Sequence, residues 1–140
     1  MQIRIKKLTP EAIIPQAQRP GDAGLDLYSI EDYELKPGER HVFKTGLSIE
    51  LPHGFVSLIW GRSGLAVRHG LATIAGLIDS NYRGEYSVII LNTSNENYMV
   101  KKGDRIAQLL IQKHENVEFV ETEELSDSAR GAAWSGSSGY

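Results

Sequence analysis

An apolar run that ends in a carboxylate is the segment of this chain best suited to chemistry. Residues 76–78 lead into Asp79, and Tyr82 follows before a turn signal at residues 83–84. A carboxylate at the end of a strand can accept a proton from a water molecule. A β-hairpin here would also leave backbone donors and acceptors near its tip, which could bind the edge of a flat ligand. The alternative is that Asp79, which Ser and Asn follow, is only a turn residue.

A second segment combines two glycines, an arginine and a hydroxyl. Residues 61–66, Gly-Arg-Ser-Gly-Leu-Ala, follow a predicted strand and open a predicted helical turn. Arg62, the Ser63 hydroxyl and nearby backbone N–H groups could therefore converge on an anion. The alternative is that Arg62 is a surface charge beside a simple turn.

Two more polar residues stand inside strand-like runs. Asp26 lies between two leucines, where a carboxylate must be paired, solvated or close to a cation. Gln108 is the single polar residue of the strand predicted after the turn at residues 102–104, so its amide needs partners from the protein or from a ligand.

Composition narrows the classes of function. The 140 residues carry 15 Lys and Arg against 18 Asp and Glu, a net charge of −3, and the basic residues are scattered. No nucleic-acid binding is expected, because neutralising many phosphates needs clustered cations. The absence of cysteine excludes disulfides and thiolate sites by count. The histidines show no ligand-like spacing, so a His-based metal site is not expected.

No membrane span or targeting segment is expected either. Residues 1–9 alternate apolar and basic residues without the apolar core of a signal peptide. The longest uncharged apolar stretch, residues 70–78, is far shorter than the ~20 residues that a transmembrane helix needs. We therefore expect a soluble cytoplasmic protein, or one of the nucleus or host cell if the source is eukaryotic or viral.

Short strands separated by turn signals must position the candidate residues. Apolar alternation or composition predicts strands at residues 2–6, 47–51, 55–60, 87–91 and 105–111. Only residues 63–69 favour a helix, with Ser63 near its N-terminus. Gly- and Pro-rich turns recur between the strands, which is typical of a β-sandwich, jelly roll or barrel. We predict one all-β domain over residues 1–125.

The end of the chain differs in kind. Residues 130–140 contain three Gly, three Ser and two Ala beside Arg130 and two aromatic residues. One interpretation is a frayed C-terminus. The other is a flexible arm over residues 126–140 that closes over a phosphate, using backbone N–H groups and the charge of Arg130.

Taken together, five segments resemble the five ordered motifs of the trimeric dUTPase family. They are residues 23–27, 61–66, 76–84, 103–108 and 130–139, so the resemblance covers nearly the whole chain. It implies a homotrimer of jelly-roll-like β-clip subunits that hydrolyses dUTP to dUMP and pyrophosphate with Mg²⁺. Such an enzyme limits uracil incorporation into DNA and supplies dUMP for thymidylate synthesis. Each active site would take segments from three subunits.

The resemblance also implies roles for single residues. Asp79 matches the general base, Tyr82 packs against the deoxyribose, and Arg130 clamps the γ-phosphate. Asp26 matches a carboxylate that reaches the metal through water only. The other substrate-binding residues that it implies are Arg62, Ser63, Gly64 and Gln108 for the phosphates, Thr73, Gly76, Leu77, Ile78 and Ser87 in a uracil-binding hairpin, and Trp134, Ser135 and Gly136 in the tail.

Departures from the family pattern leave one role open. Asn81 replaces a common Asp, and Gly61 replaces a common Pro. In the tail, Trp134 stands one place before the family's aromatic residue, and Ser135 occupies that place. Either Trp134 reaches the base through a shifted backbone, or the stacking contact is missing.

Two alternatives come from other functional classes. One is a dCTP deaminase of the same superfamily, whose relatives lack the pattern of residues 76–82. The other is a non-enzymatic member that binds a nucleotide or a protein partner as a regulator; the intact Asp79 argues against lost catalysis but not against an added partner. Measuring pyrophosphate release and product identity for dUTP, dCTP, dTTP and UTP would distinguish these two alternatives from a dUTPase.

Overall fold

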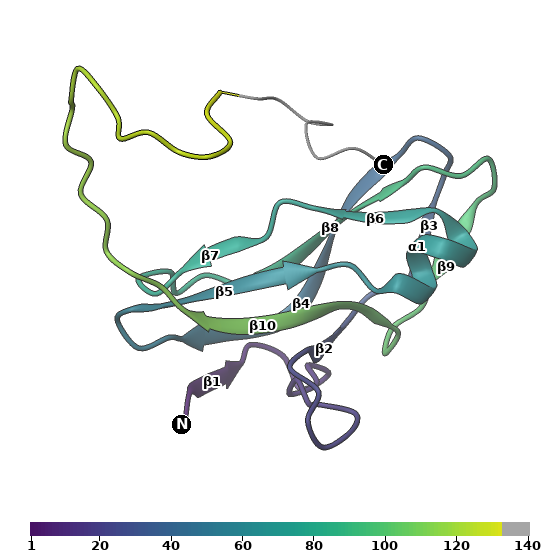
Figure 1. The fold of residues 1–140 in the computed structure, drawn as a ribbon. Helices are drawn as coiled ribbons and strands as arrows, with labels where there is room; N and C mark the ends of the chain where they lie inside the picture. Colours follow the sequence, from purple (N-terminus) through teal and green to yellow (C-terminus); the bar gives the residue numbers. More distant parts are fainter. Residues whose placement is uncertain (133–140) are drawn as a thin grey trace.

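The computed structural model describes residues 1–132 and contains two antiparallel sheets packed face to face (Figure 1). The first sheet has the spatial order β1 (Arg4–Lys7), β4 (Arg40–Glu50), β8 (Tyr86–Asn92) and β6 (Leu71–Ile74). The second has the order β2 (Leu25–Tyr28), β10 (Arg105–Lys113), β5 (Phe55–Trp60) and β7 (Leu77–Asp79). A separate pair joins β3 (Tyr33–Leu35) to β9 (Tyr98–Val100), and α1 (Ser63–His69) links β5 to β6.

The core lies between the two sheets and follows from alternation along the strands. In β8, every second residue is buried, from Tyr86 through Val88 and Ile90 to Asn92. Phe43 of β4 and residues of β10 complete the same apolar cluster. Because successive strand side chains point to opposite faces, each sheet gives one face to this core. The predicted all-β, jelly-roll-like fold is confirmed.

Several predicted elements match the observed ones closely. The strand at residues 55–60 and the helix at residues 63–69 have the predicted bounds. The strand predicted at 105–111 extends to Lys113, and the one at 47–51 is the end of the longer β4. Strands β3 and β9 have only three residues each and were missed, because so short a run shows no clear pattern and their pairing is a tertiary contact.

The predicted hairpin over residues 73–87 is only partly formed, which is a correction to the sequence prediction. The β6–β8 ladder ends at the pair Ile74 and Ile89, and β7 leaves to pair with β5 of the other sheet. The change of sheet occurs at Ala75 and Gly76, which both have positive φ, 59° and 111°. A Cβ at Gly76 would lie 2.8 Å from Ile59 Cβ, so this crossing needs glycine.

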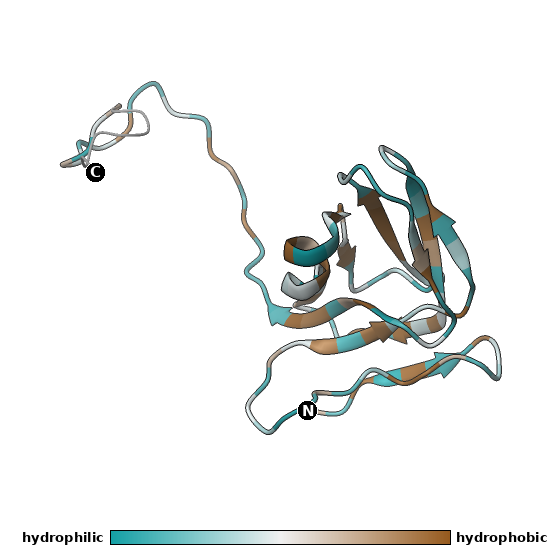
Figure 2. Ribbon diagram, turned by 90° about the vertical axis from the view of Figure 1, so that its right-hand side faces the viewer, coloured by the Kyte–Doolittle hydropathy of each residue, from teal (hydrophilic) through white to brown (hydrophobic). Residues whose placement is uncertain are grey.

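After Lys113 the described chain has neither helix nor strand. Residues 114–132 are exposed and leave the sandwich as an arm from the end of β10 (Figures 1 and 2). The boundary at residue 125 stays a prediction. No helix within the described residues is long and apolar enough to cross a membrane.

Candidate active site

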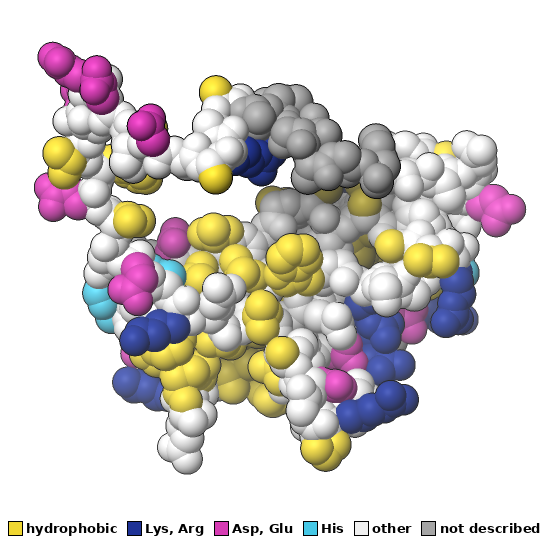
Figure 3. All heavy atoms as spheres, in the orientation of Figure 1, with side chains coloured by type: hydrophobic (Ala, Val, Ile, Leu, Met, Phe, Trp, Pro, Cys, Tyr) yellow, Lys and Arg dark blue, Asp and Glu magenta, His cyan; other side chains and the backbone are white. Residues whose placement is uncertain are grey.

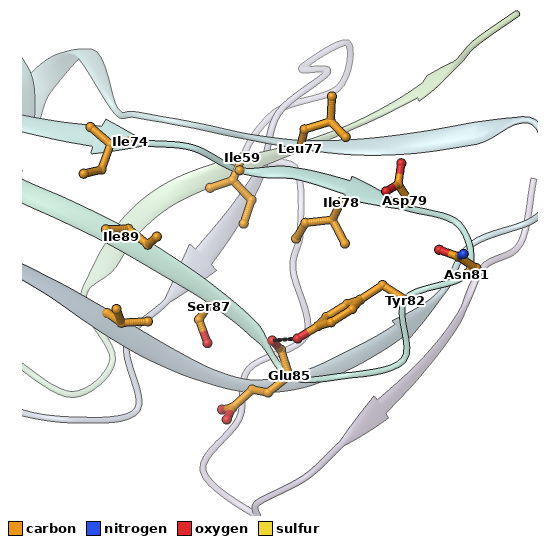
Figure 4. A pocket seen from close by; sticks show the side chains of 12 residues that line it. Ile59, Ile74, Leu77, Ile78, Asp79, Asn81, Tyr82, Glu85, Ser87 and Ile89 are labelled. Carbon is orange, nitrogen blue, oxygen red and sulfur yellow. Dashed lines mark hydrogen bonds between the residues drawn. The ribbon is translucent and has the colours of Figure 1, made fainter. Parts of the chain in front are cut away.

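A pocket of about 360 Å³ opens where β7 departs from β6 and β8 (Figure 4). Ile59, Ile74 and Ile89 form its apolar interior. Figure 4 shows Ile78 pointing inward, whereas Asp79 points to the other side of β7 and occupies the rim. The remaining lining residues are Val42, Gly76, Leu77, Asn81, Tyr82, Glu85 and Ser87. We call this cavity the Asp79 pocket.

Two strand edges border the Asp79 pocket. β7 is the last strand of its sheet, so the backbone edge that faces away from β5 has no strand partner among the described residues. On the other side, residues 86–88 of β8 lie beyond the end of the β6–β8 ladder. Backbone N–H and C=O groups that point outward from such edges have no partner in a strand ladder. A flat polar ring between them can therefore be bound by its edge.

Two tyrosines stabilise one end of this pocket. The Tyr82 hydroxyl donates to the carbonyl of Glu85 at 3.1 Å, and the ring centroids of Tyr82 and Tyr86 are 6.2 Å apart. Burial raises the pKa of Tyr86, and its hydrogen bond with Ser57, 2.9 Å long, opposes that rise. Tyr86 therefore remains a neutral structural residue, whereas Tyr82 is 44% exposed and available to a ligand.

A second hollow of about 470 Å³ adjoins the first on the other side of β7. It contains Thr73, Trp60 and Gly61, and it shares Gly76 and Leu77 with the Asp79 pocket. The predicted uracil-binding residues are thus divided: Thr73 lines this hollow, and the other four line the Asp79 pocket.

A cluster of charges lies at the opposite end of β5. Asp26 is buried, with 2% of its side chain exposed. Its Oδ2 accepts a hydrogen bond from Arg105 Nη1 at 3.2 Å, and its Oδ1 lies 3.5 Å from Arg62 Nε. Arg62 also donates through Nη1 to the carbonyl of Arg105. We call these three side chains the arginine cluster. Two guanidinium groups share one carboxylate, so the cluster keeps an excess positive charge that favours an anion.

Gln108 and the start of α1 border the arginine cluster. Gln108 stands between Asp26 and Trp60 in the β2–β10–β5 register, and its amide packs against Gly24. α1 begins at Ser63, and no side chain caps it. The backbone turn thus places Ser63 beside Arg62, with Gly64 following.

The two regions do not meet within one chain. Asp79 pairs with Val56 at one end of β5, whereas Trp60 at the other end leads into Arg62. At the rise of an extended strand, Val56 and Trp60 are about 13 Å apart, and Arg62 lies farther on. A base at Asp79 and phosphate ligands at Arg62 are therefore separated by most of the length of β5.

The described residues offer no preformed metal cage. No group of three or more His, Asp or Glu residues could hold an ion there. Asp26 Oδ1 is buried and makes no hydrogen bond, so it can still accept one from a metal-bound water. Direct ligation would have to compete with two arginines. The residues thus fit a cation that brings most of its own ligands.

Sequence reasoning missed Arg105, which holds Asp26, and Glu85, which lines the Asp79 pocket. A contact between Arg105 and Asp26 spans most of the chain, so no local pattern indicates it. Arg130 is described and exposed. The tail predictions for Trp134, Ser135 and Gly136 lie outside the described residues.

Comparisons with known proteins agree with this geometry. The family model for dUTPase matches residues 10–139. The deoxyuridine 5'-triphosphate nucleotidohydrolase of Nautilia profundicola is 49% identical to this chain, and the alignment covers 99% of each of the two sequences. That of Thermobifida fusca is also 49% identical, over 99% of this chain and 79% of its own length.

Solved structures show the same likeness. The dUTPase of Staphylococcus bacteriophage 80alpha with dUpNHpp has a TM-score of 0.90 at 30% identity, with 99% of each chain covered. A dUTPase from phage phi11 of S. aureus that coordinates a structural Mg(II) ion has a TM-score of 0.85 at 26% identity, covering 91% of this chain and 100% of its own. The fold, the ordered motifs and the match over nearly the whole length lead to one conclusion: this chain belongs to the dUTPase family.

Proposed function

We propose that this chain hydrolyses dUTP to dUMP and pyrophosphate, with Asp79 as the general base. The observation that carries the proposal is the Asp79 pocket, in which two unpaired strand edges face one another and a carboxylate stands at the rim. Family membership supports the same substrate, because the relatives are dUTP nucleotidohydrolases and one solved relative holds a dUTP analogue.

The reaction needs a positioned water and a base. The Asp79 carboxylate takes a proton from the water, whose oxygen forms a bond to the α-phosphorus. The bond from that phosphorus to the bridging α,β-oxygen breaks, and its electron pair leaves with pyrophosphate. Asp79 points away from the apolar interior (Figure 4), and the proposal places the triphosphate on that side of β7.

Base and sugar are selected by different parts of the Asp79 pocket. Backbone groups of residues 76–78 and 86–88 bind the uracil edge, and Ile59, Ile78 and Ile89 contact its faces. A thymine methyl would need space that these strands occupy, and cytosine presents a different pattern of donors and acceptors. The Tyr82 ring packs against the deoxyribose, where a 2′-hydroxyl would clash.

The phosphates are bound by the arginine cluster of a second subunit in a homotrimer. Arg62, Ser63, Gly64 and Gln108 supply these contacts, and the distance along β5 explains why they must come from another copy. Hydrophobic side chains gather on the face of β5, β7 and β10 (Figure 3), where Trp60 and Leu77 are 61% and 68% exposed. Such a face is suited to burial against a neighbouring subunit.

The C-terminal arm completes the site from a third subunit. It is exposed on its own chain and extends away from it (Figure 2), so it is positioned to reach a neighbour. Arg130 would contact the γ-phosphate, and residues 126–140 would close over the nucleotide.

Bound Mg²⁺ would supply positive charge to the phosphate oxygens. On this chain Asp26 would contact it through water only.

A nucleotide panel tests the proposed function. Pyrophosphate release from dUTP, with dUMP as the other product, is expected to exceed that from dCTP, dTTP and UTP by more than about 100-fold. Deamination of dCTP would instead support a deaminase. Binding without turnover of any of the four nucleotides would support a regulatory member.

A further inference from the structure

The turn between β7 and β8 carries the residues on which catalysis and sugar selection depend. It follows Asp79 directly, and the Tyr82 amide donates to the Asp79 carbonyl at 3.2 Å. Asn81 and Tyr82 are exposed, so side-chain burial alone does not fix the turn. Other contacts must hold it in place.

Arg83 supplies the main contacts. Its Nη1 donates to the Ser80 carbonyl at 2.6 Å and to the Tyr82 carbonyl at 2.8 Å. Its Nη2 lies 3.8 Å from Glu50 Oε1 on β4, and its own carbonyl accepts a hydrogen bond from Ser48 Oγ at 2.8 Å. One planar guanidinium group with several donors thus joins the turn to the neighbouring sheet.

The position of the Tyr82 ring depends directly on this part of the backbone. A Cβ at Gly84 would overlap the Tyr82 hydroxyl group, so the ring lies across the α-carbon of Gly84. The hydroxyl also donates to the Glu85 carbonyl (Figure 4). Any shift of residues 83–85 therefore moves the ring.

We propose that Arg83 is a positioning residue for sugar selection: by holding the turn, it keeps the Tyr82 ring where it excludes a 2′-hydroxyl. This inference rests on the proposed function. Arg83 does not line the Asp79 pocket; it lines a separate surface hollow with Arg4, Lys6, Ser48, Glu50 and Ile5. It acts on Tyr82 through the backbone carbonyls of the turn and does not contact the nucleotide.

Arg4 provides a matched control. Its Nε lies 3.3 Å from Glu50 Oε2, so Arg4 and Arg83 contact the same carboxylate, but no hydrogen bond joins Arg4 to the turn in the described structure. Arg4→Gln and Arg83→Gln therefore each remove one arginine from Glu50. Only Arg83→Gln also removes the bonds to the Ser80 and Tyr82 carbonyls.

The test compares kcat/KM for dUTP, UTP and dTTP in the two variants. In Arg83→Gln the preference for dUTP over UTP should fall about fivefold or more, whereas the preference for dUTP over dTTP should stay unchanged. Arg4→Gln should change neither preference by more than about twofold. Arg83→Lys should recover part of the sugar preference, since one ammonium can donate to two carbonyls. An unchanged dUTP-to-UTP ratio in Arg83→Gln overturns the proposal.

Amide hydrogen exchange of residues 80–86 tests the same contacts without substrate. Exchange should be faster in Arg83→Gln than in wild type or in Arg4→Gln. Equal exchange in the two variants also overturns the proposal. If wild type does not hydrolyse dUTP, the proposed function fails by that measurement, while exchange still decides whether Arg83 holds the turn.

Discussion

The Asp79 pocket and the arginine cluster are built in opposite ways. The Asp79 pocket combines backbone edges with an apolar interior, and the Asp79 carboxylate stands at its exposed rim. In the arginine cluster a carboxylate is buried, and two arginines that are 27% and 41% exposed surround it. Backbone edges suit a neutral ring with fixed donors and acceptors, whereas an excess of guanidinium groups suits a polyanion.

The two regions also differ in how the chain assembles them. The Asp79 pocket draws mainly on residues 74–89, which are nearly contiguous. The arginine cluster combines β2, the β5–α1 turn and β10. Because they lie at opposite ends of β5, the proposed active site combines them only between chains.

Loss of the base should have the largest effect. Asp79→Asn keeps the shape of the rim but removes the proton acceptor, so kcat should fall by about two to four orders of magnitude. Binding of dUpNHpp, measured by calorimetry, should change little. Normal turnover would show that Asp79 is only a turn residue.

Mixed trimers test whether the two regions act together across chains. Asp79→Asn and Arg62→Ala chains, co-expressed with different tags, should each be nearly inactive alone. In each mixed trimer one of the three sites would combine an intact Asp79 with an intact Arg62 from another chain, so purified mixed trimers should recover about one third of the wild-type activity. No recovery would place both residues of a site in one chain.

Asp26→Asn should weaken the arginine cluster and the fold. The change removes the carboxylate that positions Arg62 and Arg105, so the misplaced guanidinium groups should raise KM for dUTP, and two buried ion pairs are lost, which should lower the free energy of unfolding by about 1–3 kcal/mol. Urea denaturation at one fixed protein concentration measures the second effect. Glu50→Gln is the control: Glu50 also contacts two arginines but is 40% exposed, so its loss should cost less than about 1 kcal/mol. If Asp26→Asn and Glu50→Gln lower the free energy of unfolding equally, the burial of Asp26 has no energetic consequence.

Tyr82→Ala should weaken the selection of deoxyribose over ribose and leave Asp79, the proposed general base, unaffected. Opening the space beside C2′ should reduce the ratio of kcat/KM for dUTP over UTP by about tenfold. The preference for dUTP over dTTP serves as the internal control. If the sugar ratio does not change, Tyr82 does not contact the sugar.

Trp134→Ala should have the smallest effect. If Trp134 stacks on the base, its loss should weaken dUpNHpp binding by about 1 kcal/mol. Indole fluorescence in a Trp60→Phe background should then respond to dUpNHpp. Truncation before Arg130 should cost far more, since it removes the charge and the arm together. If Trp134→Ala leaves the affinity for dUpNHpp unchanged, and if Trp134 fluorescence in the Trp60→Phe variant does not respond to dUpNHpp, then the tail acts through Arg130 and its backbone alone.

The sequence determined the local features of this protein. Alternation and turn residues gave the bounds of β5 and α1, and the five ordered segments indicated the family, since such signals lie within a few neighbouring residues. The candidate base, Asp79, was also visible, because an apolar run ending in a carboxylate is a local pattern.

Only the tertiary structure decided how these segments meet. It separated β7 from the predicted hairpin, buried Asp26 between Arg62 and Arg105, and placed Asp79 and Arg62 at opposite ends of β5. Each of these results depends on pairing between strands that are distant in sequence, and pairing energy comes from side chains of both partners. The sequence of one strand does not show which distant strand it pairs with, so these contacts become defined only when the two sheets pack.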